Sequence, residues 1–207
     1  MKHLRNLMAL AIAGMMATSG MAMSKDEHKA AKDRVEADYK SAKAQCDTLK
    51  DNAKDVCEKE AKGNEKVAKA ELEAQYKPSD KNTYKVHEAR ADANYEVAKE
   101  KCDDLSGNAK DVCVKDAKAA HVKAKEDAKV AKAQAKPATG HTTMTNDSAA
   151  AHNNAVTAKQ ADVAETKKDA DEAKRKADYK AAKERCDAMS GDAKDKCVAD
   201  AKREYAQ

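Results

Sequence analysis

The sequence contains no tryptophan and no phenylalanine, and six tyrosines are its only large aromatic side chains. Proline occurs twice and glycine six times. Such a composition cannot build the thick, aromatic-rich core of an ordinary enzyme domain. Alanine accounts for 46 of the 207 residues, and charged residues for 38% of the chain. Because alanine, lysine and glutamate are strong helix formers, we expect long, thin helices rather than disorder or an α/β enzyme.

An excess of one charge is also lacking. The chain has 41 basic and 37 acidic residues, a formal net charge of +4. Residues 1–22 contain two of the basic residues and no acidic one, so the remainder carries only +2. This small excess gives no reason to expect nucleic acid as a partner.

Long apolar runs are absent except at the N-terminus. There a basic start precedes the almost wholly apolar stretch 7–17, and Gly20 and Ala22 place small residues at the −3 and −1 positions of a signal-peptidase site. We therefore expect residues 1–22 to be a signal peptide, cleaved after Ala22 or nearby. The alternative is an uncleaved anchor, but 7–22 has 16 residues and a spanning helix needs about 20. The mature chain is predicted to have no stable membrane insertion.

A pattern of 26 residues occurs three times, at 37–62, 93–118 and 177–202, with twelve positions identical in all copies. The shared residues include a tyrosine, two cysteines and the Ala-Lys-Asp before the second cysteine. Such repetition indicates one supersecondary unit used three times. The predicted fold is all-α: three elongated helical hairpins, each resembling an antiparallel coiled coil.

Each copy is expected to fold as helix, tight turn and helix. An apolar seam with spacings of 4, 3, 4 and 3 predicts the first helix. In the first copy the seam is Val35, Tyr39, Ala42, Cys46 and Leu49, and in the second Ala91, Tyr95, Ala98, Cys102 and Leu105. The returning helix of the second copy is expected to bury Ala109, Cys113, Ala117, Ala120 and Ala124. The tyrosines at 39, 95 and 179 are predicted to be the largest core residues.

The turns are predicted from glycines and capping residues. Gly107 and Gly191 suit a left-handed helix C-terminus, whereas Lys50-Asp51 replaces this glycine in the first copy and predicts a different turn there. The expected N-caps of the second helices are Asn52, Asn108 and Asp192.

Pro78 should interrupt the helices between the first two copies, and a stretch rich in Thr, Asn, Ala and Ser begins at Pro137. The expected organisation is a signal peptide at 1–22, hairpins at 23–78 and 79–136, a flexible linker at 137–154 and a third hairpin at 155–207.

The six cysteines are predicted to form one disulfide within each copy. Behind a signal peptide, an even number of cysteines implies disulfides. The two cysteines of a copy would lie at the same height on antiparallel helices, within the reach of about 7 Å between bridged Cα atoms. The pairs are Cys46–Cys57, Cys102–Cys113 and Cys186–Cys197.

Two other uses of the cysteines compete with this interpretation. Metal sites favour short Cys or His spacings, which are missing, and a thiol oxidoreductase would need Cys-x-x-Cys beside a βαβ pattern. The histidines show no repeat and are expected on the surface, as are Lys54, Lys110 and Lys194. We predict no catalytic, cofactor-binding or metal-binding residues.

The repeat pattern Tyr-x2-Ala-Lys-x2-Cys-Asp-x3-Gly-Asn-Ala-Lys-Asp-Val-Cys-x3-Ala-Lys resembles a group of uncharacterised exported proteins of Gram-negative bacteria. These are often labelled TolA-like or cell envelope biogenesis proteins. The resemblance covers most of residues 24–136 and again 160–205, and it implies a periplasmic location.

The expected function is a non-enzymatic structural or interaction role in the cell envelope, with stress as one setting. Partners would be other envelope proteins or further copies of the chain. A periplasmic holdase-type chaperone is the alternative, although little exposed apolar surface is expected. Metal binding is less favoured because short ligand spacings are missing. A membrane-surface role is less favoured because acidic residues are interleaved with the basic ones.

Overall fold

The computed structural model describes residues 23–137 and 147–206, in which all regular structure is helical. The helices are α1 (Lys25–Cys46), α2 (Asp51–Tyr76), α3 (Asp80–Lys101), the 3₁₀ helix η1 (Cys102–Asp104), α4 (Gly107–Ala135), α5 (Asp147–Cys186) and α6 (Gly191–Glu204). The predicted all-α fold of three hairpins is confirmed. The hairpins are α1–α2, α3–α4 and α5–α6. The predicted signal peptide lies outside the described residues.

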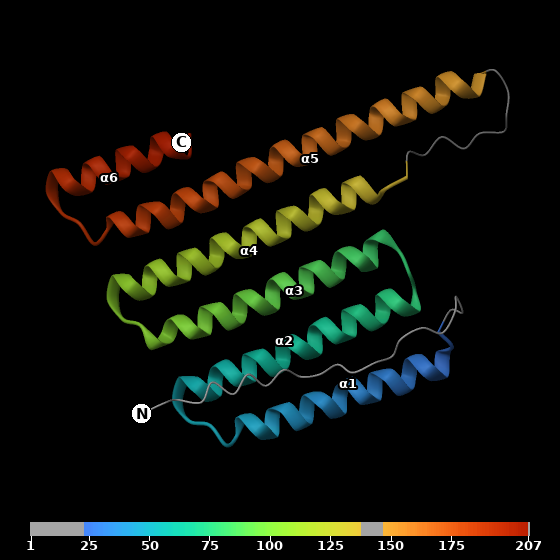
Figure 1. Cartoon of the computed structure of the whole chain (residues 1–207), viewed down its shortest axis with the longest axis horizontal. Coiled ribbons are helices and arrows are strands. Elements are labelled where there is room, and N and C mark those ends of the chain that lie inside the picture. The colour runs from blue at the N-terminus through green and yellow to red at the C-terminus, as the bar shows by residue number, and fades with distance from the viewer. Residues whose placement is uncertain (1–22, 138–146, 207) are drawn as a thin grey trace, which may run out of the picture.

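The six helices lie side by side in a single antiparallel row (Figure 1). Each helix packs mainly against the helices before and after it in the chain. The three turns within hairpins therefore lie along one edge of the row, at the same end of the helices, and we call this edge the turn end. The connection between α2 and α3 lies at the opposite end, where Ser79 accepts a hydrogen bond from the Asn82 backbone N–H and caps α3.

Small side chains form the contacts between helices. The buried apolar residues are mostly alanines, with Leu72, Val86 and three cysteines. Alanine lets helix axes approach closely, so a row one helix thick can form without large core residues. Tyr39, Tyr95 and Tyr179 are only half-buried, so the prediction that they form the core holds in part.

The apolar seam predicted for the returning helix is partly wrong. Ala117 is buried, but Ala109, Ala120 and Ala124 are exposed. The additional buried positions on α4 are Ala119, Ala128 and Ala133. The reason is that α4 packs against α3 on one side and α5 on the other, so it buries two stripes instead of one.

One expectation about the third hairpin is also corrected. The sequence predicts a linker over 137–154, of which 138–146 lie outside the described residues, whereas α5 already begins at Asp147. In addition, α5 packs closely along α4. The alanines of this stretch favour helix, and the stretch continues into the part of α5 that packs on α4, where Lys136 pairs with Asp162.

Candidate functional site

The three disulfides form at the turn end, with the predicted pairing. The Cα atoms of Cys46 and Cys57 are 5.5 Å apart, and those of the Cys102–Cys113 and Cys186–Cys197 pairs are 5.7 Å apart. Cys46, Cys102 and Cys186 are completely inaccessible to solvent and are the largest fully buried side chains in the described part of the chain, whereas their partners are half-buried. One half of each disulfide is thus packed in the interior of its hairpin.

An ion pair closes each turn beside its disulfide. The lysine three residues before the second cysteine contacts the aspartate that follows the first cysteine. The Nζ–Oδ1 distances are 2.9 Å for Lys54–Asp47, 3.0 Å for Lys110–Asp103 and 2.9 Å for Lys194–Asp187. The hydrogen bond from Lys54 holds the pKa of the Asp47 carboxyl below its ordinary value, and Lys194 does the same to the pKa of Asp187. The three lysines are therefore turn residues and not merely a solvated face.

The turns share one backbone conformation, which corrects the prediction of a different first turn. Gly107 and Gly191 have φ of +55° and +57°, and Asp51 takes the same left-handed conformation with φ of +50°. These residues begin the second helix instead of ending the first. The N-caps are consequently Lys50, Ser106 and Ser190, two residues before the predicted Asn52, Asn108 and Asp192.

Each turn carries one exposed apolar side chain at the same repeat position. Leu49, Leu105 and Met189 are 41%, 44% and 47% exposed, and no other large apolar side chain of the described residues is classed as exposed. The predicted seams included Leu49 and Leu105. Neither residue lies in the seam, because the first helices end near Cys46 and Cys102 and the residues that follow belong to the turns.

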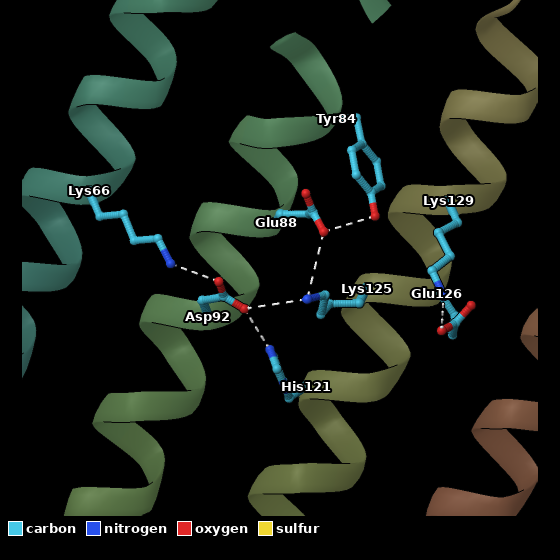
Figure 2. A network of polar contacts seen from close by, with 8 residues as sticks. All are labelled: Lys66, Tyr84, Glu88, Asp92, His121, Lys125, Glu126 and Lys129. Atoms are coloured by element: carbon cyan, nitrogen blue, oxygen red, sulfur yellow. Dashed lines mark hydrogen bonds and ion pairs between the residues drawn. The ribbon is translucent and has the colours of Figure 1, made fainter. Parts of the chain in front are cut away.

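A polar network links α2, α3 and α4 near the middle of the row (Figure 2). Asp92 of α3 accepts hydrogen bonds from Lys66 Nζ of α2 at 2.7 Å and from His121 Nε2 of α4 at 2.8 Å. Partial burial alone would raise the pKa of the Asp92 carboxyl. The hydrogen bonds from Lys66 and His121, with the charge of Lys125, outweigh burial and hold that pKa below its ordinary value.

The network continues along α3 towards Tyr84. Lys125 Nζ lies 3.8 Å from Asp92 Oδ1 and 3.6 Å from Glu88 Oε1, and the Tyr84 hydroxyl donates to Glu88 at 2.9 Å. Burial and then the bond to Glu88 raise the pKa of Tyr84 to about 12. The phenol therefore remains protonated across the physiological range and serves as a donor.

His121 and His28 are not surface residues, which corrects the sequence prediction. Their side chains are only 11% and 13% exposed. His121 stacks on Tyr95 with ring centroids 4.7 Å apart, and His28 stacks on Tyr76 at 4.2 Å. No periodic signal identifies them, because both lie outside the 26-residue repeat.

The chemistry open to the His121–Asp92 pair is limited by its surroundings. A carboxylate that orients an imidazole is a frequent arrangement in acid–base catalysis. Here, however, the other ring nitrogen, Nδ1, is buried without a hydrogen-bond partner, and one ring face is covered by Tyr95. A substrate cannot reach that nitrogen without rearrangement. The pair therefore joins helices instead of presenting a base.

The two junctions between hairpins repeat the same contacts. Glu60 of α2 pairs with Lys101 of α3 at 3.0 Å, and the equivalent Asp116 and Arg185 pair between α4 and α5 at 2.5 Å. Lys59–Glu100 and Lys115–Glu184, at 3.6 Å each, form a second matched set. Beside them Asn108 donates to the Glu184 carbonyl oxygen at 3.1 Å.

A shallow groove accompanies each junction at equivalent positions. The groove between α2 and α3 has a volume of about 430 Å³ and includes Glu60 and Lys101 in its lining, and the groove near Asp116 and Arg185 has about 330 Å³. Their equivalent positions follow from the repeat. Both grooves are polar and open, and neither gathers reactive groups other than the residues of its junction.

Within residues 23–137 and 147–206, no group of three or more His, Cys, Asp or Glu side chains is arranged to hold a metal ion. Among the same residues no helix combines the length and apolar character needed to cross a membrane. No model of a known protein family, no curated protein and no solved structure matches the chain.

Proposed function

We propose that this chain is a non-enzymatic helical-repeat protein of the periplasm, with a structural or protein-interaction role in the cell envelope. The three disulfides support an oxidising compartment, because such bonds form and persist there. The basic and apolar N-terminal sequence, with small residues at Gly20 and Ala22, supports export.

The single row of helices is the observation that carries the interaction role. Its buried side chains are mostly alanines and cysteines, and no charged side chain of the described residues is buried. Among the described residues, each helix packs mainly against its neighbours in the row, so the row is one helix thick and its broad faces are not covered by another layer of helices (Figure 1). Repeat proteins built in this manner use extended surfaces of stacked units to bind other proteins.

Site-specific photo-cross-linking in intact cells tests this function. A photo-reactive amino acid would replace Lys62 or Arg175, exposed residues on α2 and α5. We expect discrete adducts with envelope proteins or with a second copy of the chain. The matched control is the same chain without residues 1–22, which should remain inside the cell and lose those adducts.

Two outcomes would contradict the proposal. One is an identical, diffuse cross-linking pattern in the exported chain and in the control. The other is efficient suppression of client aggregation by the purified protein without any discrete partner, which would favour a holdase-type chaperone. N-terminal sequencing provides an independent check, because the exported chain should begin near Met23.

A further inference from the structure

The turn end combines three apolar side chains that no helix of the described residues covers. Leu49, Leu105 and Met189 occupy the same position of the repeat, and the three turns lie along one edge of the row (Figure 1). Helix axes in contact are about 8–10 Å apart, so successive hairpins place these side chains roughly 16–20 Å from one another. The edge thus presents an apolar residue at regular intervals.

The sequence concentrates its few long aliphatic residues at this position. Beyond residue 23 it contains three leucines and two methionines, and three of these five residues are Leu49, Leu105 and Met189. The residues on either side vary between copies, whereas the apolar character is kept, with methionine replacing leucine in the third copy. Methionine preserves a flexible apolar contact surface. A purely solvated turn would favour a polar residue here.

The turn segments that carry these side chains are themselves acidic. The segments 47–55, 103–111 and 187–195 contain nine aspartates and four lysines, a formal charge of −5 in a chain whose net charge is +4. Three of the aspartates are engaged by the turn lysines, and the remaining six are exposed. Charge complementarity therefore selects a cationic partner. It opposes both an anionic bilayer and the turn end of a second copy.

We propose that the turn end binds a basic amphipathic segment of another protein, with apolar residues of that segment contacting Leu49, Leu105 and Met189. The inference rests on the proposed interaction role and names the chemistry of the partner. Three contacts spread over roughly 32–40 Å would be spanned by about 21–27 residues of helix. Aspartates at the rim would orient the segment and accelerate its association.

Peptide binding to the full mature chain tests this inference. The probe is a fluorescent 25-residue helical peptide made of lysine and leucine, with a glutamate–leucine peptide of the same pattern as its charge control. Anisotropy titrations would compare the wild type with the triple variant Leu49→Gln, Leu105→Gln, Met189→Gln. We expect that variant to bind at least about tenfold more weakly, because apolar burial is lost while charge is unchanged.

Two charge variants locate the electrostatic contribution. Neutralising Asp55, Asp111 and Asp195 to Asn should weaken binding and reduce its salt dependence. The matched control neutralises Asp33, Glu165 and Asp169, which are exposed but lie about 20 Å or more from the turns along their helices. The control should bind within about twofold of the wild type. Circular dichroism confirms the fold of each variant, and the single change Met189→Gln replaces the triple variant if the latter unfolds.

Equal binding by all variants would overturn the inference, as would stronger binding to anionic vesicles than to the peptide. Photo-cross-linking from position 104, in the second turn, separates this failure from that of the proposed function. Partners found from positions 62 and 175 but not from 104 would reject only the turn end as the binding surface. No partner from any of the three positions would reject the interaction role itself.

Discussion

The two helices within a hairpin are joined by a disulfide with Cα atoms 5.5–5.7 Å apart, whereas neighbouring hairpins meet through alanines, one glycine and matched ion pairs. The disulfide acts over a short loop and needs little surrounding core. The junction depends on close helix approach and on charges that water can reach. A chain poor in large apolar residues thus stabilises its hairpins covalently and assembles them non-covalently.

The largest expected effect comes from removing a disulfide in the middle hairpin. Replacing Cys102 and Cys113 with alanine should cost about 3 kcal/mol, because a loop of about twelve residues is no longer closed in the unfolded chain. Helicity should persist, since α3 and α4 each pack against another hairpin. Thermal melts followed by circular dichroism, without reductant, measure both quantities. Unchanged melting would show that the hairpins do not depend on their covalent links.

A bulky residue at Gly63 is expected to break the junction between the first two hairpins. A Cβ atom there would lie 2.8 Å from Ala93 Cβ of α3, so the helices must separate. We expect Gly63→Leu to cost about 2 kcal/mol despite its better helix propensity. Urea unfolding provides the measurement. The equivalent position on α4 is Ala119, where a side chain is already present, and Ala119→Gly serves as the comparison.

The turns allow a smaller, two-sided test within the hairpins. Asp51→Gly should stabilise the chain by up to about 1 kcal/mol, because glycine adopts a positive φ without the steric cost that aspartate has. Gly107→Ala should destabilise it by a similar amount for the opposite reason. Chemical denaturation of both variants checks the signs. Two effects of the same sign would contradict the assignment of one shared turn conformation.

Reversing the charges of the Asp116–Arg185 pair tests how much the ion pairs contribute to the junction between hairpins. Arg185→Asp places like charges beside each other, because Asp116 lies opposite, and should cost about 0.5–1 kcal/mol. Adding Asp116→Arg should restore most of the loss. The coupling free energy from this double-mutant cycle is the relevant quantity. A value near zero would mean that alanine packing alone holds the junction.

The smallest effect is a pH dependence at Asp92, which contacts both its own hairpin and the preceding one. The folded-state pKa of Asp92 is depressed below its unfolded value of about 4. The contribution of Asp92 to the free energy of unfolding is therefore complete above about pH 4 and is lost as the pH falls through the lower, folded-state pKa. Melting temperatures of the wild type and Asp92→Asn should differ at pH 7 and converge below about pH 4. A difference that grows on acidification would reverse the assigned sign.

The features that were predictable from sequence are those determined by short separations along the chain. Cys102 and Cys113 are eleven residues apart with a glycine between them, so their pairing and the turn follow from local geometry. Pro78 likewise separates α2 from α3, as predicted. Helical periodicity places Leu105 in the seam because it does not reveal that α3 ends at Lys101 and that only the short 3₁₀ helix η1 follows.

Contacts between distant residues could not be predicted in the same manner. His121 and Asp92 are 29 residues apart, and neither belongs to the repeat, so no pattern connects them. The helices α4 and α5 pack together although a stretch of weak pattern separates them in the sequence. The residues buried between them are mostly alanines, and alanine also occurs on exposed faces. Composition cannot distinguish an alanine that packs from one that is solvated.

The nearest-neighbour order of the helices makes this protein close to a one-dimensional system. Its free energy of folding is approximately a sum over hairpins and the junctions between them, without a shared centre that every element must reach. Folding can therefore begin in any hairpin and propagate in either direction, through contacts that are mostly short-range and hence rapid to form. The same additivity means that opening α1 or α6 leaves the central junctions largely intact.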